Sequence, residues 1–195
     1  MTEKNAAPSG ITMEYGTIDS GDLESLFTKD RDYLIMESSP VDGYQNLRYE
    51  IRFPEVVGLT RMEITIQGVR ATKFVNQNVY AWNYNTATWI FGYSMDVRPA
   101  LKEFGVSFRG SGYSGKDRPI RLLFTADLKV LDSFRVYLDS ISIMAESEAP
   151  EATLKDKLMA LTLVYPWDTI WYGGAISHLT GLGADKIIAE MEKGK

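Results

Sequence analysis

Apolar and polar residues alternate with a period of two along much of the first three quarters of the chain. In the clearest runs one face is apolar and the other carries charged residues, as expected for antiparallel strands with one solvated side. The apolar members of these runs are Tyr49, Ile51 and Phe53 in 48–53, and Met62, Ile64 and Ile66 in 61–67. Both sets are therefore predicted to point into a core.

Shorter runs of the same character, separated by Gly, Pro, Asn and Asp, predict further strands at 11–15, 33–36, 78–84, 88–91, 120–124 and 134–144. The run 78–84 leaves two assignments open, because either Val79 and Ala81, or Tyr80, Trp82 and Tyr84, could face inward. In 134–144 the inward parity changes after Leu138, which predicts a bulge or bend near Asp139. About eight or nine strands at this spacing indicate a mainly β fold, an antiparallel jelly-roll β-sandwich.

The alternation stops near residues 144–151 and helical spacing follows. Three parts are predicted: a flexible leader at 1–10, the jelly-roll sandwich at 11–146 and a short C-terminal α-helical arm at 147–195. Helices this short are not stable alone, so the arm is expected to pack on the body or on a partner. The residues predicted to form a partner interface are Leu158, Tyr165, Trp167, Ile170, Trp171 and Tyr172.

Charge and composition exclude several classes of function. A net charge of −5 argues against general nucleic-acid binding, which needs a basic footprint. The absence of cysteine excludes disulfides, thiolate nucleophiles and cysteine-ligated metals. Residues 1–10 do not resemble a signal peptide, and 160–182 is interrupted by Pro and Gly, so no membrane partner is expected.

No catalytic constellation is apparent in the sequence, and we expect no enzymatic activity and no cofactor. The single histidine, His178, has no nucleophile-elbow motif to accompany it. A structural Ca²⁺ is the one metal considered, because Asp30, Asp32 and Asp139 offer carboxylates and calcium prefers oxygen ligands. Aspartates also favour turns for local hydrogen-bonding reasons, and this interpretation is preferred for all three.

An aromatic cluster falls on one predicted hairpin: Tyr80, Trp82, Tyr84 and Trp89. Aromatic rings on a sheet face can stack on the apolar faces of sugar rings, which makes these four residues candidates for glycan binding. Large aromatic side chains also fill the cores of sandwiches. The sequence favours the core location for Trp82 and Trp89 over a ligand platform.

The body resembles galactose-binding-like jelly-roll domains, the fold of many carbohydrate-binding modules. The resemblance rests on Tyr15-Gly16-Thr17, on Asp30 with Asp32-Tyr33-Leu34, on the run 79–84 leading to Trp89, and on the run 134–141. It covers about 11–146 and none of the arm. Related non-catalytic domains occur in secreted surface proteins and in bacteriophage virion proteins, so the resemblance implies a binding or structural role.

The resulting hypothesis is a non-enzymatic structural component of a virus particle, a phage capsid or tail accessory or decoration protein assembled through its C-terminal arm. Its partners would be other virion proteins and further copies of itself, after folding in the host cytoplasm. The alternative is a carbohydrate-binding module that recognises surface glycans. The oligomeric state, the choice between capsid and tail, and packing of the arm in cis or in trans stay open.

Overall fold

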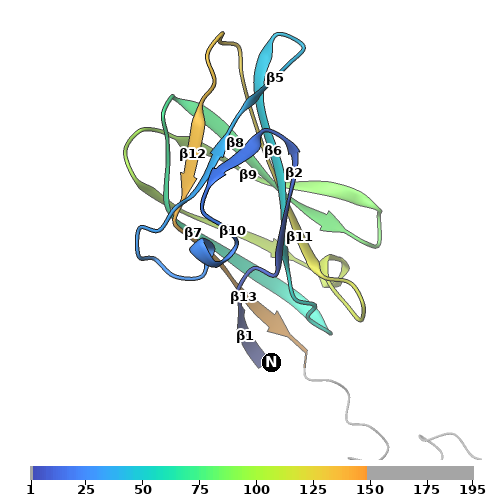
Figure 1. Cartoon of the computed structure of the whole chain (residues 1–195). Helices are drawn as coiled ribbons and strands as arrows, with labels where there is room; N and C mark the ends of the chain where they lie inside the picture. Colours follow the sequence, from blue (N-terminus) through green and yellow to red (C-terminus); the bar gives the residue numbers. More distant parts are fainter. Residues whose placement is uncertain (1, 149–195) are drawn as a thin grey trace, which may run out of the picture. The chain divides into compact units, whose positions relative to one another are not determined.

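The computed structural model describes residues 2–148, which belong to one unit spanning 1–149. The six predicted interface residues, from Leu158 to Tyr172, and the helical arm lie outside the described residues. The described part forms two antiparallel sheets packed face to face (Figure 1). This confirms the predicted mainly β sandwich.

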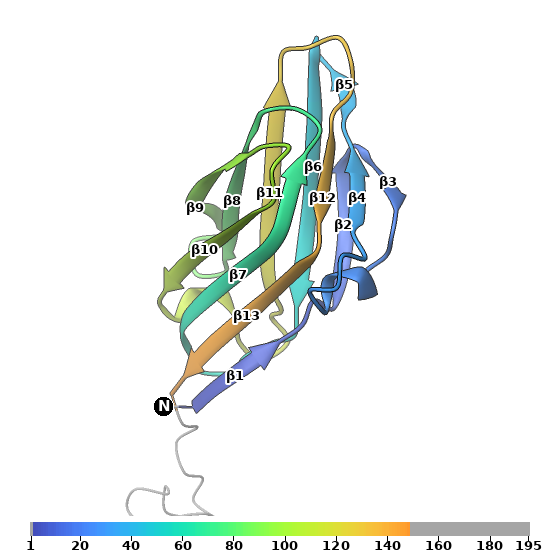
Figure 2. The same cartoon turned by 90° about the vertical axis from the view of Figure 1, so that its left-hand side faces the viewer.

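The first sheet has seven strands in the order β1-β13-β7-β12-β4-β3, and β10 pairs with β7. Figure 2 shows β1 beside β13, at the edge of this sheet. The long strand β7 pairs with β13 and β12 on one side and with β10 on the other. The strands are β1 (Thr2–Ala6), β3 (Thr17–Ser20), β4 (Leu34–Glu37), β7 (Leu59–Ala71), β10 (Lys102–Arg109), β12 (Arg135–Leu138) and β13 (Ser140–Ser147).

The second sheet has six strands in the order β2-β6-β11-β8-β9, and β5 pairs with β6. Two 3₁₀ turns, η1 (Glu24–Leu26) and η2 (Ser111–Tyr113), connect strands. Over residues 2–148, no helix has the length and apolar content needed to cross a membrane. The strands are β2 (Gly10–Tyr15), β5 (Ser39–Val41), β6 (Tyr44–Phe53), β8 (Val75–Asn83), β9 (Thr88–Val97) and β11 (Ile120–Leu128).

The core lies between the two sheets, and the alternation in β6 and β7 supplies it as predicted. The inner positions named from the sequence in 48–53 and 61–67 are all buried. Tyr49 stacks on Phe124 with ring centroids 5.0 Å apart and planes within 6°. Burial raises the pKa of Tyr49, and its hydroxyl accepts a hydrogen bond of 2.9 Å from Gln77 Nε2. The side chain therefore stays neutral and hydrogen-bonded inside the core.

The predicted bend in 134–144 lies at Asp139, where β12 ends and β13 begins. Gly68 on β7 adopts φ +63°, a left-handed conformation that favours glycine. A Cβ atom at Gly68 would lie 2.4 Å from Asp139 Cβ. From Met62 to Gly68 the buried residues of β7 have even numbers, and after Gly68 they have odd numbers. In β13 the buried residues after Ser140 likewise have odd numbers. The bend is thus a feature of two paired strands.

Three segments differ from the sequence-based expectations. The predicted leader instead contributes β1, whose backbone pairs with β13 along all five residues and buries Ala6. In the segment 97–104, where Pro99 favours a helical turn or loop, β10 already begins at Lys102. The segment 107–117, whose Gly and Ser content is typical of a mobile loop, continues β10 to Arg109 and then forms η2. These differences raise the strand count above the predicted number.

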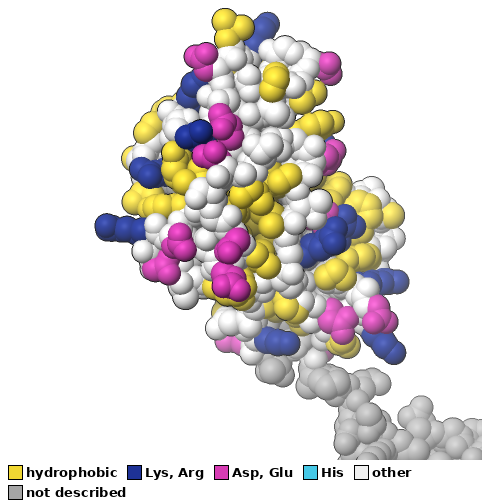
Figure 3. Space-filling view, viewed as in Figure 1, with side chains coloured by type: hydrophobic (Ala, Val, Ile, Leu, Met, Phe, Trp, Pro, Cys, Tyr) yellow, Lys and Arg dark blue, Asp and Glu magenta, His cyan; other side chains and the backbone are white. Residues whose placement is uncertain are grey.

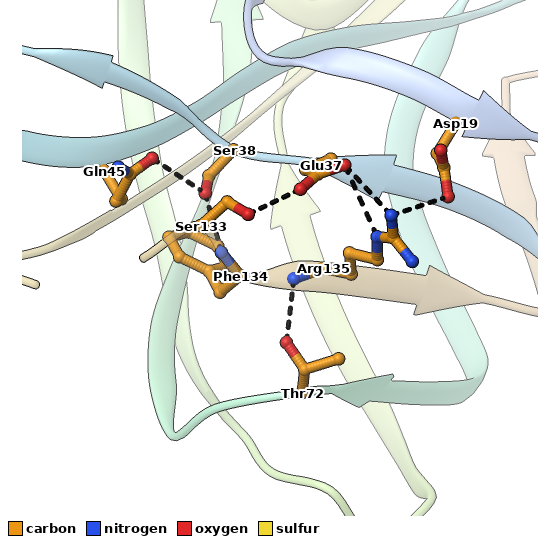
Figure 4. Close-up of polar contacts among 8 residues, drawn as sticks. All are labelled: Asp19, Glu37, Ser38, Gln45, Thr72, Ser133, Phe134 and Arg135. Carbon is orange, nitrogen blue, oxygen red and sulfur yellow. Dashed lines mark hydrogen bonds and ion pairs between the residues drawn. The ribbon is translucent and has the colours of Figure 1, made fainter. Parts of the chain in front are cut away.

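Polar contacts hold β12 to its neighbours at the start of the strand (Figure 4). The Arg135 guanidinium lies 3.2 Å from Glu37 Oε2 on β4 and 3.4 Å from Asp19 Oδ2 on β3. Hydrogen bonds from Ser133 and then Arg135 lower the pKa of Glu37. The Phe134 and Arg135 N–H groups donate to hydroxyls of neighbouring segments, each at 2.9 Å. This network fixes the outer edge of the seven-stranded sheet.

Candidate functional site

Trp82 and Trp89 lie opposite one another on β8 and β9, on the outer face of the six-stranded sheet. Both are partly exposed, and so is Tyr80 on the same face of β8. Side chains alternate along a strand, and the inner positions of β8 here are the fully buried Val79 and Ala81. The core location favoured for the two tryptophans is therefore wrong.

The reason is the volume already occupied beneath β8. Phe124 on β11 pairs with Val79 on one side and with Tyr49 on the other. The stacked rings of Tyr49 and Phe124 fill the space between the sheets at this level. A close-packed core cannot also accommodate two indole rings, so small residues occupy the inner positions of β8.

Arg121 on β11 holds the tryptophan pair from the neighbouring strand. Its guanidinium carbon lies 5.2 Å from the Trp82 ring centroid and 5.3 Å from that of Trp89. The two indole rings meet edge to face, 5.2 Å apart. The same guanidinium donates two hydrogen bonds to Glu50 on β6, at 2.9 and 2.6 Å. This bidentate geometry fixes the cation, and through it the two rings.

Glu50 remains ionised beneath this cluster. Partial burial acts to raise the pKa of Glu50, but hydrogen bonds from Arg121 and Arg52 outweigh it, and the pKa is lowered. Arg52 Nε–H donates to Glu50 Oε1 at 2.6 Å. The hydrogen bond that Arg121 donates to Glu50 likewise raises the pKa of Arg121. Both partners are charged at neutral pH, so this carboxylate is poorly suited to act as a general acid.

Three adjoining hollows lie along this outer face. The central hollow has a volume of about 350 Å³ and shares Trp89, Arg48 and Leu123 with a second hollow of about 270 Å³. It shares Asn46 and Asp127 with a third hollow of about 300 Å³ near the β5–β6 turn. Figure 3 shows hydrophobic and basic side chains side by side over the β8–β9 hairpin. We name the three hollows together the aromatic groove, lined among others by Glu14, Asn46, Arg48, Tyr80, Trp89 and Asp127.

The groove combines exposed ring surface with polar groups. Trp89 lines two of the hollows and Tyr80 lines the central one, on a floor that includes Leu123. Arg48 and Glu14 form an ion pair of 2.7 Å at one side. Aromatic rings beside hydrogen-bonding groups suit a ligand with one apolar face and many hydroxyls.

The four predicted aromatic residues have two different roles. Tyr80 and Trp89 line the aromatic groove. Trp82 instead packs between Arg121, Trp89 and Tyr84, whose ring meets it edge to face at 6.5 Å. The Tyr84 hydroxyl donates a hydrogen bond of 2.8 Å to the Pro119 carbonyl oxygen. Trp82 and Tyr84 therefore support the lining residues.

Sequence reasoning missed the polar residues of the site. Arg121 and Glu50 are 71 positions apart and meet only because β11 pairs with β6. Outward polar residues on a strand are most simply interpreted as solvated surface. The aromatic run on β8 was the one sequence feature that could have located the site. It indicates the outer face of this sheet once Tyr80 and Trp82 are assigned to face outward.

Two of the three aspartates considered for calcium accept hydrogen bonds from protein groups. Asp139 is buried, and its Oδ1 accepts hydrogen bonds from the backbone N–H groups of Asp30 and Arg31, at 3.2 and 2.9 Å. Asp30 accepts from its own loop, through Thr28 and the Asp32 N–H, and these bonds lower its pKa. Among residues 2–148, no three acidic or histidine side chains are grouped to hold a metal ion. The local hydrogen bonds expected of a turn are present at Asp30, whereas Asp139 binds backbone groups 109 and 108 positions away.

The virion hypothesis rests on the arm, whose residues lie outside those described. Assembly through Leu158, Tyr165, Trp167, Ile170, Trp171 and Tyr172 stays a prediction, as do self-association and location in a virus particle.

Comparisons with known proteins give structural neighbours only. No family model and no curated protein matches the sequence. A family 29 carbohydrate-binding module from Piromyces equi aligns over 75% of this chain and 93% of its own, with 11% identity and a TM-score of 0.46. A CBM4 structure aligns over 74% and 94%, with 12% identity and a TM-score of 0.45. TmCBM61, solved with β-1,4-galactotriose, aligns over 70% and 88%, with 9% identity and a TM-score of 0.45.

These neighbours are carbohydrate-binding modules with a β-sandwich fold. The virion hypothesis receives no support from them. With identities this low and TM-scores below 0.5, the likeness assigns no ligand to this chain. What the site can bind has to be inferred from its own residues.

Proposed function

We propose that this protein binds glycans in the aromatic groove and acts without catalysis. The observation that carries the proposal is the position of Trp89, which is partly exposed where two hollows adjoin. Its ring is held by Arg121 and Trp82, so the surface it offers is fixed before a ligand arrives. A preorganised ring loses little conformational entropy on binding.

A sugar ring would stack its apolar face on Trp89 or Tyr80 and turn its hydroxyls toward the polar lining. Asn46 Nδ2 donates to the Val41 and Tyr44 carbonyl oxygens, each at 3.3 Å, which leaves Asn46 Oδ1 to accept from a hydroxyl. Asp127 is exposed and its side chain has no hydrogen bond or ion pair with any other residue between 2 and 148, so its carboxylate is free to accept from hydroxyls. Arg48 adds donors to the lining of the central hollow.

A binding experiment on the full chain tests the proposal. A glycan array first identifies a soluble oligosaccharide, and calorimetry then measures its Kd for the wild type and for Trp89→Ala. We expect the substitution to weaken binding about tenfold or more, because large aromatic contacts dominate interface energies.

Tyr93→Ala is the matched control. Tyr93 is also an aromatic residue on β9 and is 45% exposed, but it does not line the groove. Its removal should leave the Kd unchanged, while circular dichroism verifies that both variants fold. The proposal fails if no glycan binds, or if Trp89→Ala keeps the wild-type Kd.

A further inference from the structure

A separate hollow, of about 310 Å³, lies at the bend between Gly68 and Asp139 and shares no lining residue with the aromatic groove. The segment after η1 forms one side of it and the start of β10 the other. We name it the basic hollow, since three of its lining residues are cations. Besides the two residues of the bend, its lining residues are Lys29, Arg31, Tyr33, Leu101, Lys102 and Glu103.

Two of the three cations that line this hollow have carboxylate partners. Lys29 forms an ion pair with Glu103, and the two side chains are 50% and 54% exposed. Lys102 Nζ donates to the Asp96 carbonyl oxygen at 3.0 Å and lies 3.5 Å from its carboxylate. Arg31 has no carboxylate partner within the described part of the chain. Arg31 is therefore the lining cation without a carboxylate partner, while the buried Asp139 carboxylate at the bend is bound by the backbone N–H groups of Asp30 and Arg31.

The backbone at Arg31 is held in an unusual conformation. Its φ is +72°, a left-handed region that costs a non-glycine residue about 1 kcal/mol or more. The Arg31 N–H donates to Asp139 Oδ1, and the Asp30 N–H binds the same oxygen. Glycine would satisfy this turn with less strain. A long cationic side chain is thus present where the backbone alone does not call for one.

A further unpaired cation lies behind one wall of the hollow. The Arg70 guanidinium lies 5.2 Å from the Tyr33 ring centroid and 4.4 Å from that of Tyr137. No carboxylate between residues 2 and 148 pairs with Arg70. Stacking on rings orients a guanidinium but does not neutralise its charge. Tyr33, which lines the hollow, therefore has a second guanidinium without a carboxylate partner stacked on its ring.

We propose that the basic hollow binds a tetrahedral oxyanion, the phosphate or sulfate group of a small molecule. Arg31 presents the planar fork of donors that suits such a group, and Lys29 and Lys102 add point charges. Glu103 competes with the anion for Lys29 in the free protein. The Tyr33 ring forms an apolar surface for the molecule that carries the group.

The test is a ¹H–¹⁵N titration of the full chain with inorganic phosphate and, separately, inorganic sulfate, against chloride at equal ionic strength. We expect saturable shifts of the Arg31, Gly68 and Lys102 amides with phosphate or sulfate and none with chloride. The anion with the lower Kd identifies whether phosphate or sulfate esters are the better ligands.

Two substitutions should act in opposite directions. Arg31→Gln removes the fork and should weaken binding about tenfold, or about 1.4 kcal/mol. Glu103→Gln releases Lys29 and should strengthen binding. Lys129→Gln, at an exposed lysine that does not line the hollow, is the matched control and should change nothing.

Saturation by neither oxyanion would overturn the proposal. Equal Kd values for the wild type and Arg31→Gln would do so as well. If Arg31→Gln loses its folded spectrum, Glu103→Gln decides the matter, because weaker or unchanged binding in that variant contradicts competition by Glu103.

Discussion

Replacing Glu50 by Gln tests how the tryptophan pair is held. The substitution keeps the shape of the side chain and removes the charge that Arg121 and Arg52 share. Arg121 is then left without a carboxylate partner beneath two indole rings. We expect a loss of folding stability together with a looser Trp89.

The contacts set the size of the loss. A hydrogen bond to a charged group contributes about 1.5–3 kcal/mol, and Arg121 makes two to the same carboxylate. The Glu50 side chain is only 12% exposed, but that of Arg121 is 29% exposed, so solvent screens part of the attraction. We therefore expect Glu50→Gln to lower the free energy of unfolding by about 2 kcal/mol. With a denaturant slope of about 4 kcal/mol per molar guanidinium, the midpoint should fall by about 0.5 M.

The loss should depend on pH in one direction. The pKa of Glu50 is lower in the folded chain than its ordinary value of 4.5. Its stabilising contribution is therefore complete above the unfolded pKa and disappears as pH falls through the folded one. The free-energy difference between the wild type and Glu50→Gln should be largest at neutral pH and should shrink in acid.

Guanidinium unfolding followed by tryptophan fluorescence measures this difference at several pH values. Glu63→Gln is the matched control, since Glu63 pairs with Arg61 on the other sheet and is 38% exposed. That surface pair should contribute less than about 1 kcal/mol. A Glu50→Gln midpoint equal to that of Glu63→Gln, or a difference that grows in acid, would refute the reasoning.

Two further substitutions test the core and the bend. Gly68→Ala should destabilise the protein by about 3 kcal/mol in thermal unfolding, because its Cβ would lie 2.4 Å from that of Asp139 at a positive φ. Gly43→Ala, also at positive φ but with no atom within 4 Å of its Cβ, should cost only about 1 kcal/mol, and equal losses would contradict the steric argument. Tyr49→Phe should cost about 1–3 kcal/mol in chemical denaturation, because it leaves the buried Gln77 amide without a partner, and an unchanged midpoint would count against this.

The sequence predicts the inner faces of β6 and β7 because each run has charges on one side only. β8 lacks that signal, since both of its faces carry apolar residues around Val79 and Tyr80. The correct choice depends on Tyr49 and Phe124, which come from other strands. Packing volume between distant segments is not encoded in local alternation.

Strand β1 and the polar residues of the site could not be predicted from the sequence for the same reason. β1 is exposed at Glu3, Lys4 and Asn5, and its place is determined by backbone pairing with β13. Arg121 and Glu50 meet through strand register in the same way. Such contacts depend on which strands become neighbours, and the pattern of a single strand does not contain that information.

The Trp89 indole N–H signal tests the central claim most directly. In a ¹H–¹⁵N titration of the full chain with an oligosaccharide found by the array, we expect this signal to shift saturably. The amides of Asn46 and Asp127, which line the adjoining hollows, should shift with the same Kd. Saturable binding that leaves the Trp89 signal in place and moves amides elsewhere would contradict glycan binding in the aromatic groove.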